Sequence, residues 1–288
     1  MNTGSAESMS MDLRFTEFHE EQAGITIKVK DCLYHAKSEF QTIDIIDTEA
    51  FGRMLILDGL VMTSEKDEFF YHEMIAHVPM MSHPEPKQVL VIGGGDGGTV
   101  REVLRHQSVE RVVLCEIDGL VIDSCKQFLP SIAGKLDDPR VEIQVRDGVE
   151  YIAAQKAQFD IILIDSTDPL GPGVGLFTEE FYKNVLEALK PGGIMAAQSE
   201  SPFADQKEIK LMYPLLRKVF PVVSTFVGPI PTYPAGYWSW AFCSKDVKPL
   251  EFIDEKRANE ISKETKLYNL DIHRAVFALP NFVKELVK

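Results

Sequence analysis

The chain has 288 residues, of which 45% are hydrophobic and 26% charged, and its formal net charge at pH 7 is −14. This length and composition are typical of a globular protein with a full hydrophobic core, built as one large domain or as a large and a small one. The negative charge disfavours nucleic acids and anionic membranes as partners and favours small cations. Because many proteins are acidic without binding any cation, the positions of the acidic residues have to decide the matter.

The N-terminal segment, residues 1–11, is polar and lacks the apolar run of a signal peptide. No apolar run approaches the about 18 residues that a membrane-spanning helix needs. The cysteines form no Cys-x-x-Cys pair, which is typical of a reducing compartment. They are Cys32, Cys115, Cys125 and Cys243. We therefore expect a cytoplasmic protein that has a flexible tail at residues 1–11 and no association with membranes.

Residues 12–63 show a two-residue periodicity in short stretches. Ile25 and Ile27, for example, alternate with polar residues, and turns at the sequences AFGR and LDG interrupt the apolar runs. This pattern predicts a small antiparallel β domain. Gln41 and Leu57 fall where that domain would face the next one.

Residues 65–81 show helical spacing, and Pro79 and the prolines after it bring the predicted helix to an end. The pair His72-Glu73, followed by His77, resembles a zinc motif, but its spacing is HExxxH and not HExxH. Five residues correspond to about 500° of helix, so the two imidazoles diverge by about 140°. We therefore expect no metal site here.

The sequence VLVIGGGDGGT, residues 89–99, predicts a buried strand that ends in a glycine turn and leads into a helix. Gly93, Gly95 and Gly98 match GxGxxG, the pattern of a dinucleotide-binding turn. Asp96 argues against that ligand, because a carboxylate would repel a diphosphate at the helix N-terminus. A carboxylate in this turn suits a ligand that carries positive charge, although a merely tight structural turn is the alternative.

Strands and helices alternate after the glycine turn. Strands are expected at 111–118, 140–148, 159–169 and 191–200, each with a helix after it, and two closing strands at 221–228 and 237–245. This alternation predicts a doubly wound α/β domain over residues 64–288, with right-handed crossovers and an antiparallel pair at one edge. The loop LGPGVGLF, which follows the third of these strands, is either a lid or an ordinary long loop.

Acidic residues follow the first four strands of this domain. They are Asp96, Glu116 with Asp118, Asp147, and Asp165 with Asp168. Because the carboxyl ends of parallel strands share one edge of the sheet, we expect these side chains to converge on one cleft. This placement favours a functional pocket over general acidity.

The chemistry of these acids suggests separate roles. Glu116, about twenty residues after the glycine turn, is placed to accept hydrogen bonds from two ribose hydroxyls, or else is a solvated strand end. Asp147 with Gly148 can accept from an adenine amine. Asp165 and Asp168 form a carboxylate pair beside the acid of the glycine turn, and such a cluster is costly unless a cation compensates it. A helix or loop cap is the alternative for Asp168.

A nucleoside pocket flanked by acids fits S-adenosylmethionine chemistry with a second, polycationic substrate. Ordinary S-adenosylmethionine carries a carboxylate on its methionine tail, for which Asp96 is badly placed. Decarboxylated S-adenosylmethionine carries a bare ammonium at the end of an aminopropyl chain, and Asp96 is well placed for that group.

The sequences GGGDGG, CEID, RDG, DSTDPLGP, YHEM and IPTYPAG together resemble the spermidine synthase (putrescine aminopropyltransferase) family of the bacterial type, over essentially the whole chain from residue 13. The resemblance implies a Rossmann-like, mostly parallel seven-stranded sheet of the S-adenosylmethionine-methyltransferase type with a small N-terminal antiparallel β domain. It implies transfer of the aminopropyl group of decarboxylated S-adenosylmethionine to putrescine, which yields spermidine and methylthioadenosine. The donor is a co-substrate, so no cofactor is expected. Relatives suggest a homodimer or homotetramer.

The resemblance also implies roles for single residues. Asp165 matches the catalytic acid that accepts the proton of the attacking amine, Asp168 anchors the diamine, and Asp96 holds the aminopropyl ammonium. The diamine channel is further assigned Tyr71, His72, Gln198 and Tyr233. The nucleoside side is assigned Gln41, Leu57, Glu116, Asp147, Gly148 and Pro172. An aromatic residue near the N-terminus, Phe15 or Phe18, is expected to cap the diamine.

Three other functions remain open at this stage. A methyltransferase of the same architecture would use ordinary S-adenosylmethionine. A nicotinamide dehydrogenase is disfavoured by Asp96, and a polyamine-binding protein without activity would need neither Asp165 nor a complete nucleoside pocket. The preferred acceptor, whether putrescine, cadaverine, agmatine or spermidine, depends on the length of the channel.

Overall fold

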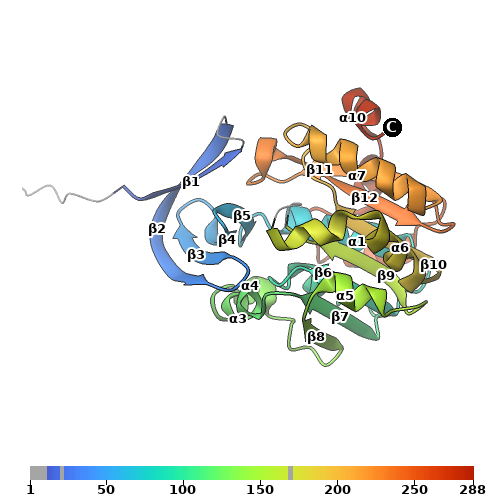
Figure 1. Ribbon diagram of the computed structural model, residues 1–288, viewed down its shortest axis with the longest axis horizontal. Coiled ribbons are helices and arrows are strands. Elements are labelled where there is room, and N and C mark those ends of the chain that lie inside the picture. Colours follow the sequence, from blue (N-terminus) through green and yellow to red (C-terminus); the bar gives the residue numbers. More distant parts are fainter. Residues whose placement is uncertain (1–11, 20–22, 168–170) are drawn as a thin grey trace, which may run out of the picture.

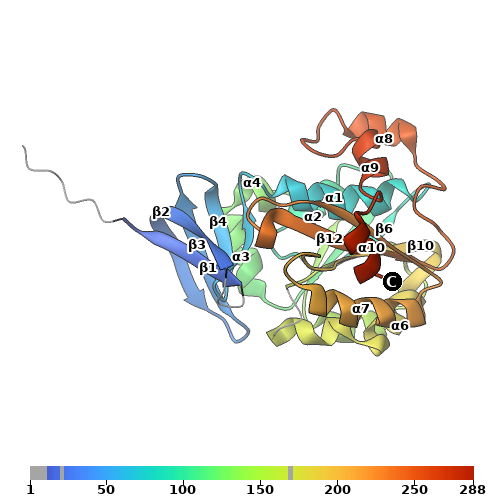
Figure 2. The ribbon, with the colours of Figure 1, turned by 90° about the horizontal axis from the view of Figure 1, so that it is seen from above.

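The computed structural model of the chain describes residues 12–19, 23–167 and 171–288, except for the side chains of residues 171 and 172. The predicted tail at residues 1–11 lies outside this part of the chain. Two β-sheets stand side by side, the smaller built from the N-terminal strands and the larger from the rest (Figure 1). Helices cover both faces of the larger sheet (Figure 2).

The smaller sheet consists of antiparallel strands in the order β1-β2-β3-β4-β5. They are β1 (Arg14–His19), β2 (Ala23–Lys37), β3 (Thr42–Thr48), β4 (Gly52–Leu57) and β5 (Leu60–Ser64). Alternation along β3 divides its side chains between two cores. Ile46 packs in a small core within this sheet, whereas Ile43 and Ile45 join the main core of the protein. The predicted antiparallel β unit is confirmed.

The larger sheet has the strand order β11-β12-β10-β9-β6-β7-β8. Its strands are β6 (Gln88–Gly93), β7 (Arg111–Glu116), β8 (Val141–Val145), β9 (Phe159–Asp165), β10 (Leu189–Gln198), β11 (Val222–Pro229) and β12 (Tyr237–Ser244). Five neighbouring strands of this sheet, β10, β9, β6, β7 and β8, are parallel to one another. Strand β12 is antiparallel to both β10 and β11. The predicted mostly parallel, seven-stranded sheet with an antiparallel edge is confirmed.

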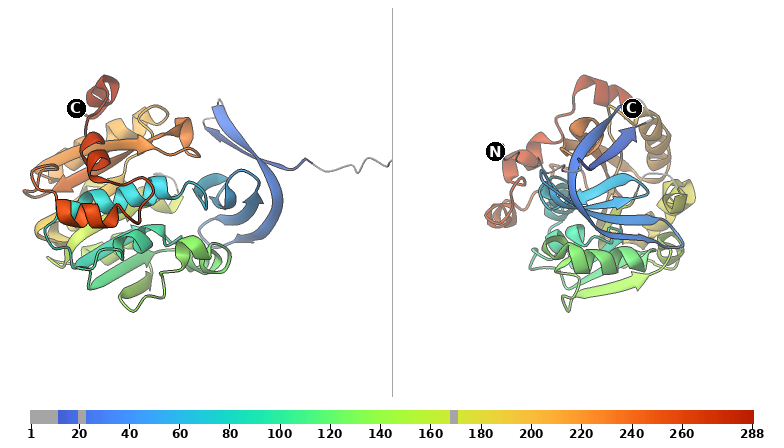
Figure 3. Two further views of the ribbon diagram at one scale, coloured as in Figure 1. Left: turned by 180° about the vertical axis from the view of Figure 1, so that it is seen from behind. Right: turned by 90° about the vertical axis from the view of Figure 1, so that its left-hand side faces the viewer.

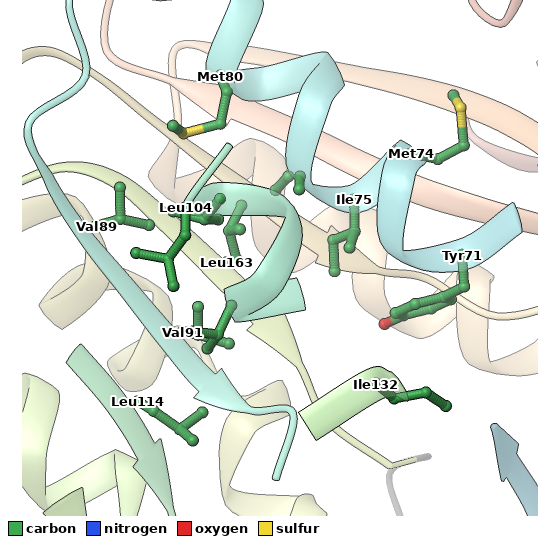
Figure 4. Packing of buried hydrophobic residues seen from close by; sticks show 14 of the residues in the cluster. Tyr71, Met74, Ile75, Met80, Val89, Val91, Leu104, Leu114, Ile132 and Leu163 are labelled. Atoms are coloured by element: carbon green, nitrogen blue, oxygen red, sulfur yellow. The ribbon is translucent and has the colours of Figure 1, made fainter. Parts of the chain in front are cut away.

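Successive side chains of the central strand β6 pack into two separate cores, one on each face of the sheet. Val89 and Val91 lie in the cluster that also holds Ile75 (Figure 4), and Leu90 and Ile92 lie in the cluster on the other face. A strand covered on both faces therefore needs a continuous apolar run. The covering helices are α1 (Phe69–Met81), α2 (Gly98–Val103), α3 (Gly119–Phe128), α4 (Pro130–Ala133), α5 (Gly148–Ala153), α6 (Glu179–Ala188) and α7 (Gln206–Val219).

The helix predicted over residues 65–81 begins only at Phe69 and carries Pro79 in its last turn. The residues before it form a turn because Asp67 has another partner. Its Oδ2 accepts hydrogen bonds from the backbone N–H and the hydroxyl of Thr232, at 3.0 and 2.8 Å. This tertiary contact holds the turn in place of a first helical turn.

The C-terminal region holds three short helices that the periodicity analysis missed: α8 (Glu255–Ile261), α9 (Leu270–Ala275) and α10 (Asn281–Leu286) (Figure 3). Their starts do carry a recognisable feature, since Asp254 and Asn269 cap α8 and α9 with side-chain oxygens. The segment predicted as a loop after β9 is partly a 3₁₀ helix, η1 (Gly171–Phe177). None of the helices in the described part of the chain combines the length and the apolar character needed to cross a lipid bilayer.

Candidate active site

A pocket lies at the carboxyl ends of β6, β7 and β9, where the larger sheet meets the smaller one. It is lined by all of the predicted site residues except two. These lining residues are Gln41, Leu57, Tyr71, His72, Asp96, Glu116, Asp147, Gly148, Asp165, Gln198 and Tyr233. The position of Asp168 and the side chain of Pro172 lie outside the described residues. The expected convergence of the strand-end acids on one cleft is therefore confirmed for Asp96, Glu116, Asp147 and Asp165.

The glycine turn lets the protein's own side chains approach the backbone. A Cβ atom on Gly94 would lie 2.6 Å from an Asp165 carboxylate oxygen, and one on Gly98 would lie 2.2 Å from His72 Cε1. Gly94 also has a φ of 68°, which favours glycine. The glycines thus make room for the side chains of Asp165 and His72, which line the pocket.

Asp96 in this turn has a partner on each oxygen. Its Oδ1 accepts a hydrogen bond of 2.8 Å from the Gly98 N–H, and its Oδ2 lies 3.3 Å from His72 Nε2. The other ring nitrogen of His72, Nδ1, lies 2.6 Å from Glu68 Oε2. Burial favours the neutral ring, but the charges of Asp96 and Glu68 outweigh it and raise the pKa of His72 well above its ordinary value. The two flanking carboxylates therefore favour the imidazolium form of His72 beside the glycine turn.

A chain of buried charges continues behind His72. Arg101 Nη2 lies 2.6 Å from Glu68 Oε2, and Arg101 Nε lies 2.8 Å from Glu102 Oε1. Glu102 Oε2 in turn lies 3.1 Å from His77 Nε2. Although burial opposes it, the neighbouring cations lower the pKa of Glu68. Sequence analysis missed Glu68 and Arg101, because nothing in their spacing shows that they meet across two helices.

The HExxxH sequence on α1 therefore has three separate roles. His72 reaches the pocket, His77 contacts the buried Glu102, and Glu73 accepts hydrogen bonds from three successive backbone N–H groups at residues 266–268. Among the described residues, no group of three or more His, Cys, Asp and Glu side chains is arranged to hold a metal ion.

Asp165 ends β9 and accepts two hydroxyl hydrogen bonds. Thr99 Oγ1 donates to its Oδ2 at 2.6 Å, and Tyr71 donates as well. Burial, together with the negative charge of Asp96, raises the pKa of Asp165 above its ordinary value. Burial and the Asp165 charge also raise the pKa of Tyr71 well above its ordinary value, so the Tyr71 hydroxyl keeps its proton and can donate it in a hydrogen bond to Asp165.

Glu116, at the end of β7, also lines the pocket. Burial raises the pKa of this carboxyl to about 7, although Glu116 Oε1 accepts a hydrogen bond of 2.9 Å from the Asp118 N–H. Asp118 Oδ2 accepts from Ser38 Oγ at 2.7 Å and from Gln41 Nε2 at 3.0 Å. These bonds tie the smaller sheet to the larger one at the edge of the pocket. Asp147, nearby, caps α5 by accepting from Val149 N at 2.7 Å.

Three aromatic rings, those of Tyr71, Tyr233 and Trp238, pack together to form an aromatic wall of the pocket. The ring of Tyr233 lies 5.9 Å from that of Tyr71 and 4.8 Å from that of Trp238, edge to face. The Tyr233 hydroxyl donates to the backbone oxygen of Met62 at 2.6 Å, which connects this wall to the smaller sheet. Gln198 Nε2 donates to a carboxylate oxygen of Glu200 at 2.9 Å.

Strand β1 contributes to the pocket with residues that were not predicted. Glu17 and His19 line it, whereas Phe18 is 63% exposed and Phe15 packs against the small core. Side chains alternate along a strand, so Phe15 and Phe18 cannot share a face. Glu17 is buried, and its Oε2 accepts a hydrogen bond of 2.7 Å from the Val61 N–H. The alternation itself was the clue that could have identified Glu17.

Comparison with known families gives two matches that together span most of the chain. Residues 68–255 match the family described as "Spermine/spermidine synthase domain", and residues 13–65 match "Spermidine synthase tetramerisation domain". The chain belongs to the spermine/spermidine synthase family. The predicted family is thereby confirmed.

Relatives of this family member agree in length and fold. The polyamine aminopropyltransferase of Bacillus mycoides is 50% identical over 278 residues, covering 96% of this chain and 100% of the relative. That of Bacillus subtilis is also 50% identical, with 96% and 99% covered. A crystal structure of a spermidine synthase in complex with the transition-state analogue AdoDATO is 48% identical with a TM-score of 0.93, and covers 96% of this chain and 94% of that one. The spermidine synthase of Thermotoga maritima is 46% identical, with a TM-score of 0.91 and the same coverage. The enzyme is an aminopropyltransferase.

Proposed function

We propose that the enzyme transfers the aminopropyl group of decarboxylated S-adenosylmethionine to putrescine, which yields spermidine and methylthioadenosine. The observation that carries this proposal is that the buried Asp96 and the half-buried Asp165 line the same pocket as Glu116 and Asp147. Asp96 and Asp165 suit ammonium and amine groups, and Glu116 and Asp147 suit ribose and adenine. The solved spermidine synthase that holds the transition-state analogue AdoDATO supports the same class of ligand.

The nucleoside end of the donor is proposed to bind at the ends of β7 and β8. Glu116 accepts hydrogen bonds from the ribose hydroxyls, and Asp147 accepts one from the adenine amine. Gln41, Leu57, Gly148 and Pro172 complete this side. The aminopropyl ammonium is proposed to lie at Asp96, with its reacting carbon toward Asp165.

The acceptor is proposed to enter along the aromatic wall. Tyr71, Tyr233 and Trp238 contact its methylene groups and exclude water, and their faces attract the ammonium ends. His72 and Gln198 lie along the same path, and Asp168 is proposed to hold the far ammonium. The near nitrogen then meets Asp165.

The chemical step is a direct displacement. The lone pair of a neutral primary amine forms the new C–N bond, the C–S bond breaks, and its electron pair leaves with the sulfur as a neutral thioether. The enzyme's task is mainly to orient both reactants and to deliver an unprotonated amine. Because the leaving group is already good, the step needs no electrophilic or redox group, and we propose that no cofactor takes part.

Asp165 is proposed to accept the proton of the attacking amine. In water, transfer from an alkylammonium to an aspartate is uphill by about 8 kcal/mol. Burial, which raises the pKa of Asp165, reduces this difference, and the donor's sulfonium reduces it further by lowering the pKa of the amine. The charge of Asp96 raises the pKa of Asp165 and of the amine alike.

Assembly and domain division belong to the same proposal. We propose a homodimer or homotetramer, because residues 13–65 match a domain described as a tetramerisation domain. We also propose that the chain divides into an N-terminal β domain at 12–63 and a catalytic domain at 64–288. The proposed location is the cytoplasm.

The deciding experiment offers the enzyme decarboxylated S-adenosylmethionine together with putrescine, cadaverine, agmatine or spermidine, and identifies the products by mass. Spermidine formed from putrescine faster than any other product is the expected result. Preference for another amine would replace the proposed acceptor. Methyl transfer from ordinary S-adenosylmethionine, without aminopropyl transfer, would contradict the proposed reaction.

A further inference from the structure

His72 lies between two carboxylates but only one of them belongs to the pocket. Asp96 lines the pocket, whereas Glu68 lies behind His72, with only 8% of its surface exposed. His72 itself is 2% exposed. Both of its ring nitrogens are engaged, at 2.6 Å from Glu68 and at 3.3 Å from Asp96. The shorter distance is the one on the side away from the pocket.

Two anions and two cations meet around His72 before any ligand binds, while Glu102 pairs with Arg101 and Arg105 behind them and Asp165 adds a carboxyl on the pocket side. Glu68 and Asp96 carry negative charges, and His72 and Arg101 carry positive ones. A ligand ammonium at Asp96 would add a third positive charge in a buried site, where charges are weakly screened. Arg101 cannot lose its proton, because a guanidinium stays charged in proteins. His72 is the cation of the cluster that can become neutral.

Other charged or titratable groups also face His72 or its partners. The groups that the neighbouring elements direct toward it are Glu68 from the turn before α1, Tyr71 from α1, Asp96 from the β6–α2 turn, Arg101 from α2 and Asp165 from the end of β9. Tyr71 stays protonated, and Asp165 accepts hydrogen bonds from Thr99 and Tyr71. Glu68 therefore remains the fixed anion that orients the ring after Asp96 changes partner.

We propose that Glu68 and Arg101 are positioning residues, which hold His72 as an imidazolium against Asp96 until the ammonium of the aminopropyl donor takes its place and His72 releases a proton. This inference rests on the proposed function, because it takes Asp96 as the site of the donor's ammonium. In the exchange, the ammonium N–H groups replace the Nε2–H on the Asp96 oxygen. The Nε2 proton passes to solvent, and the neutral ring keeps its Nδ1–H toward Glu68.

The test measures proton release by calorimetry. Decarboxylated S-adenosylmethionine is titrated into the enzyme at about pH 7.5, above the ordinary histidine pKa of about 6.5, in two buffers with different ionisation enthalpies. Methylthioadenosine is the comparison ligand, since it makes the same nucleoside contacts but lacks the aminopropyl group and the sulfonium charge. It therefore reports any proton that comes from Glu116. We expect the donor to release at least about half a proton more than methylthioadenosine does.

Two variants separate positioning from a merely structural role. In His72→Gln the difference between the two ligands should disappear, and in Glu68→Gln it should fall, because the ring has lost one of its two carboxylates. Methylthioadenosine affinity within about threefold of the wild type shows that each variant is folded. If either variant does not fold, equal proton release by the two ligands on the wild-type enzyme is still enough to contradict the inference.

Equal proton release by both ligands in the wild-type enzyme would overturn the inference, and so would a difference that persists in His72→Gln. Failure of the underlying function looks different. If Asp96→Asn binds the donor as tightly as the wild type does, Asp96 is not the ammonium site. That result would contradict both this part of the proposed function and the inference that rests on it.

Discussion

The Thr99 hydroxyl donates a hydrogen bond of 2.6 Å to the Asp165 carboxylate from the first turn of α2. The glycine turn and the end of β9 are therefore joined directly at the proposed catalytic acid. Because this bond stabilises the ionised carboxylate, it lowers the pKa of Asp165 against the larger effect of burial.

Replacing Thr99 with valine should shift the pH profile of the enzyme. Without the hydroxyl, the pKa of Asp165 rises further, so the ionised form that accepts a proton appears only at higher pH. The acidic limb of kcat/KM should therefore move upward by about one pH unit. Thr99→Ser keeps the hydroxyl and is the matched control. An unshifted limb in Thr99→Val would mean that Asp165 does not set it.

Asp165→Asn should lower kcat by about 10²- to 10⁴-fold, the usual loss when a general base is removed. Methylthioadenosine affinity should remain, because the nucleoside is proposed to bind through Glu116 and Asp147 and not through Asp165. Steady-state kinetics and calorimetry measure the two effects separately. Ordinary turnover in this variant would remove Asp165 from the proposed step.

The affinity for methylthioadenosine should rise with pH up to about 7, where Glu116 ionises, and then level off. Ribose hydroxyls donate to the carboxylate, so only the ionised form binds well. Below that pKa each unit of pH should cost about tenfold in affinity. Glu116→Gln should bind more weakly and without this pH dependence. Calorimetry across this range tests the assignment, which a pH-independent wild type would contradict.

Gly98→Ala should destabilise the fold and the pocket together. The new Cβ would lie 2.2 Å from His72 Cε1, so the imidazole has to leave Asp96. We expect a loss of about 1–3 kcal/mol in unfolding free energy, measured by chemical denaturation, and a clear loss of activity. Gly119→Ala is the matched control: Gly119 is likewise the first residue of a helix, and a Cβ there would lie 3.2 Å from Val145 Cγ1. Equal effects of both changes would contradict the steric argument.

Local patterns in the sequence were enough for the larger sheet and for the convergence of its acids. The apolar runs ending in Asp96, Glu116 and Asp165 predicted parallel strands, and parallel strands bring their carboxyl ends to one edge. No tertiary information was needed, because strand direction alone places these side chains together. The resemblance carried by motifs such as GGGDGG then supplied the family.

Partners that come from separate elements could not be found in the same way. Glu68 meets His72 four residues along the chain, but Arg101 reaches Glu68 from α2, and Gln41 reaches Asp118 from the smaller sheet. Such contacts depend on how whole elements pack, and periodicity describes one element at a time.

The sequence by itself thus determined which residue types stand at the edge of the sheet, since a strand's direction and a turn's glycines are local properties. Only the tertiary structure decided their charge states. Burial raises the pKa of Glu116, and two carboxylates from different elements keep His72 protonated. The pKa of a side chain depends on every charge nearby in space and on how much water the side chain loses. Neither can be obtained from the sequence without the packing of the separate elements.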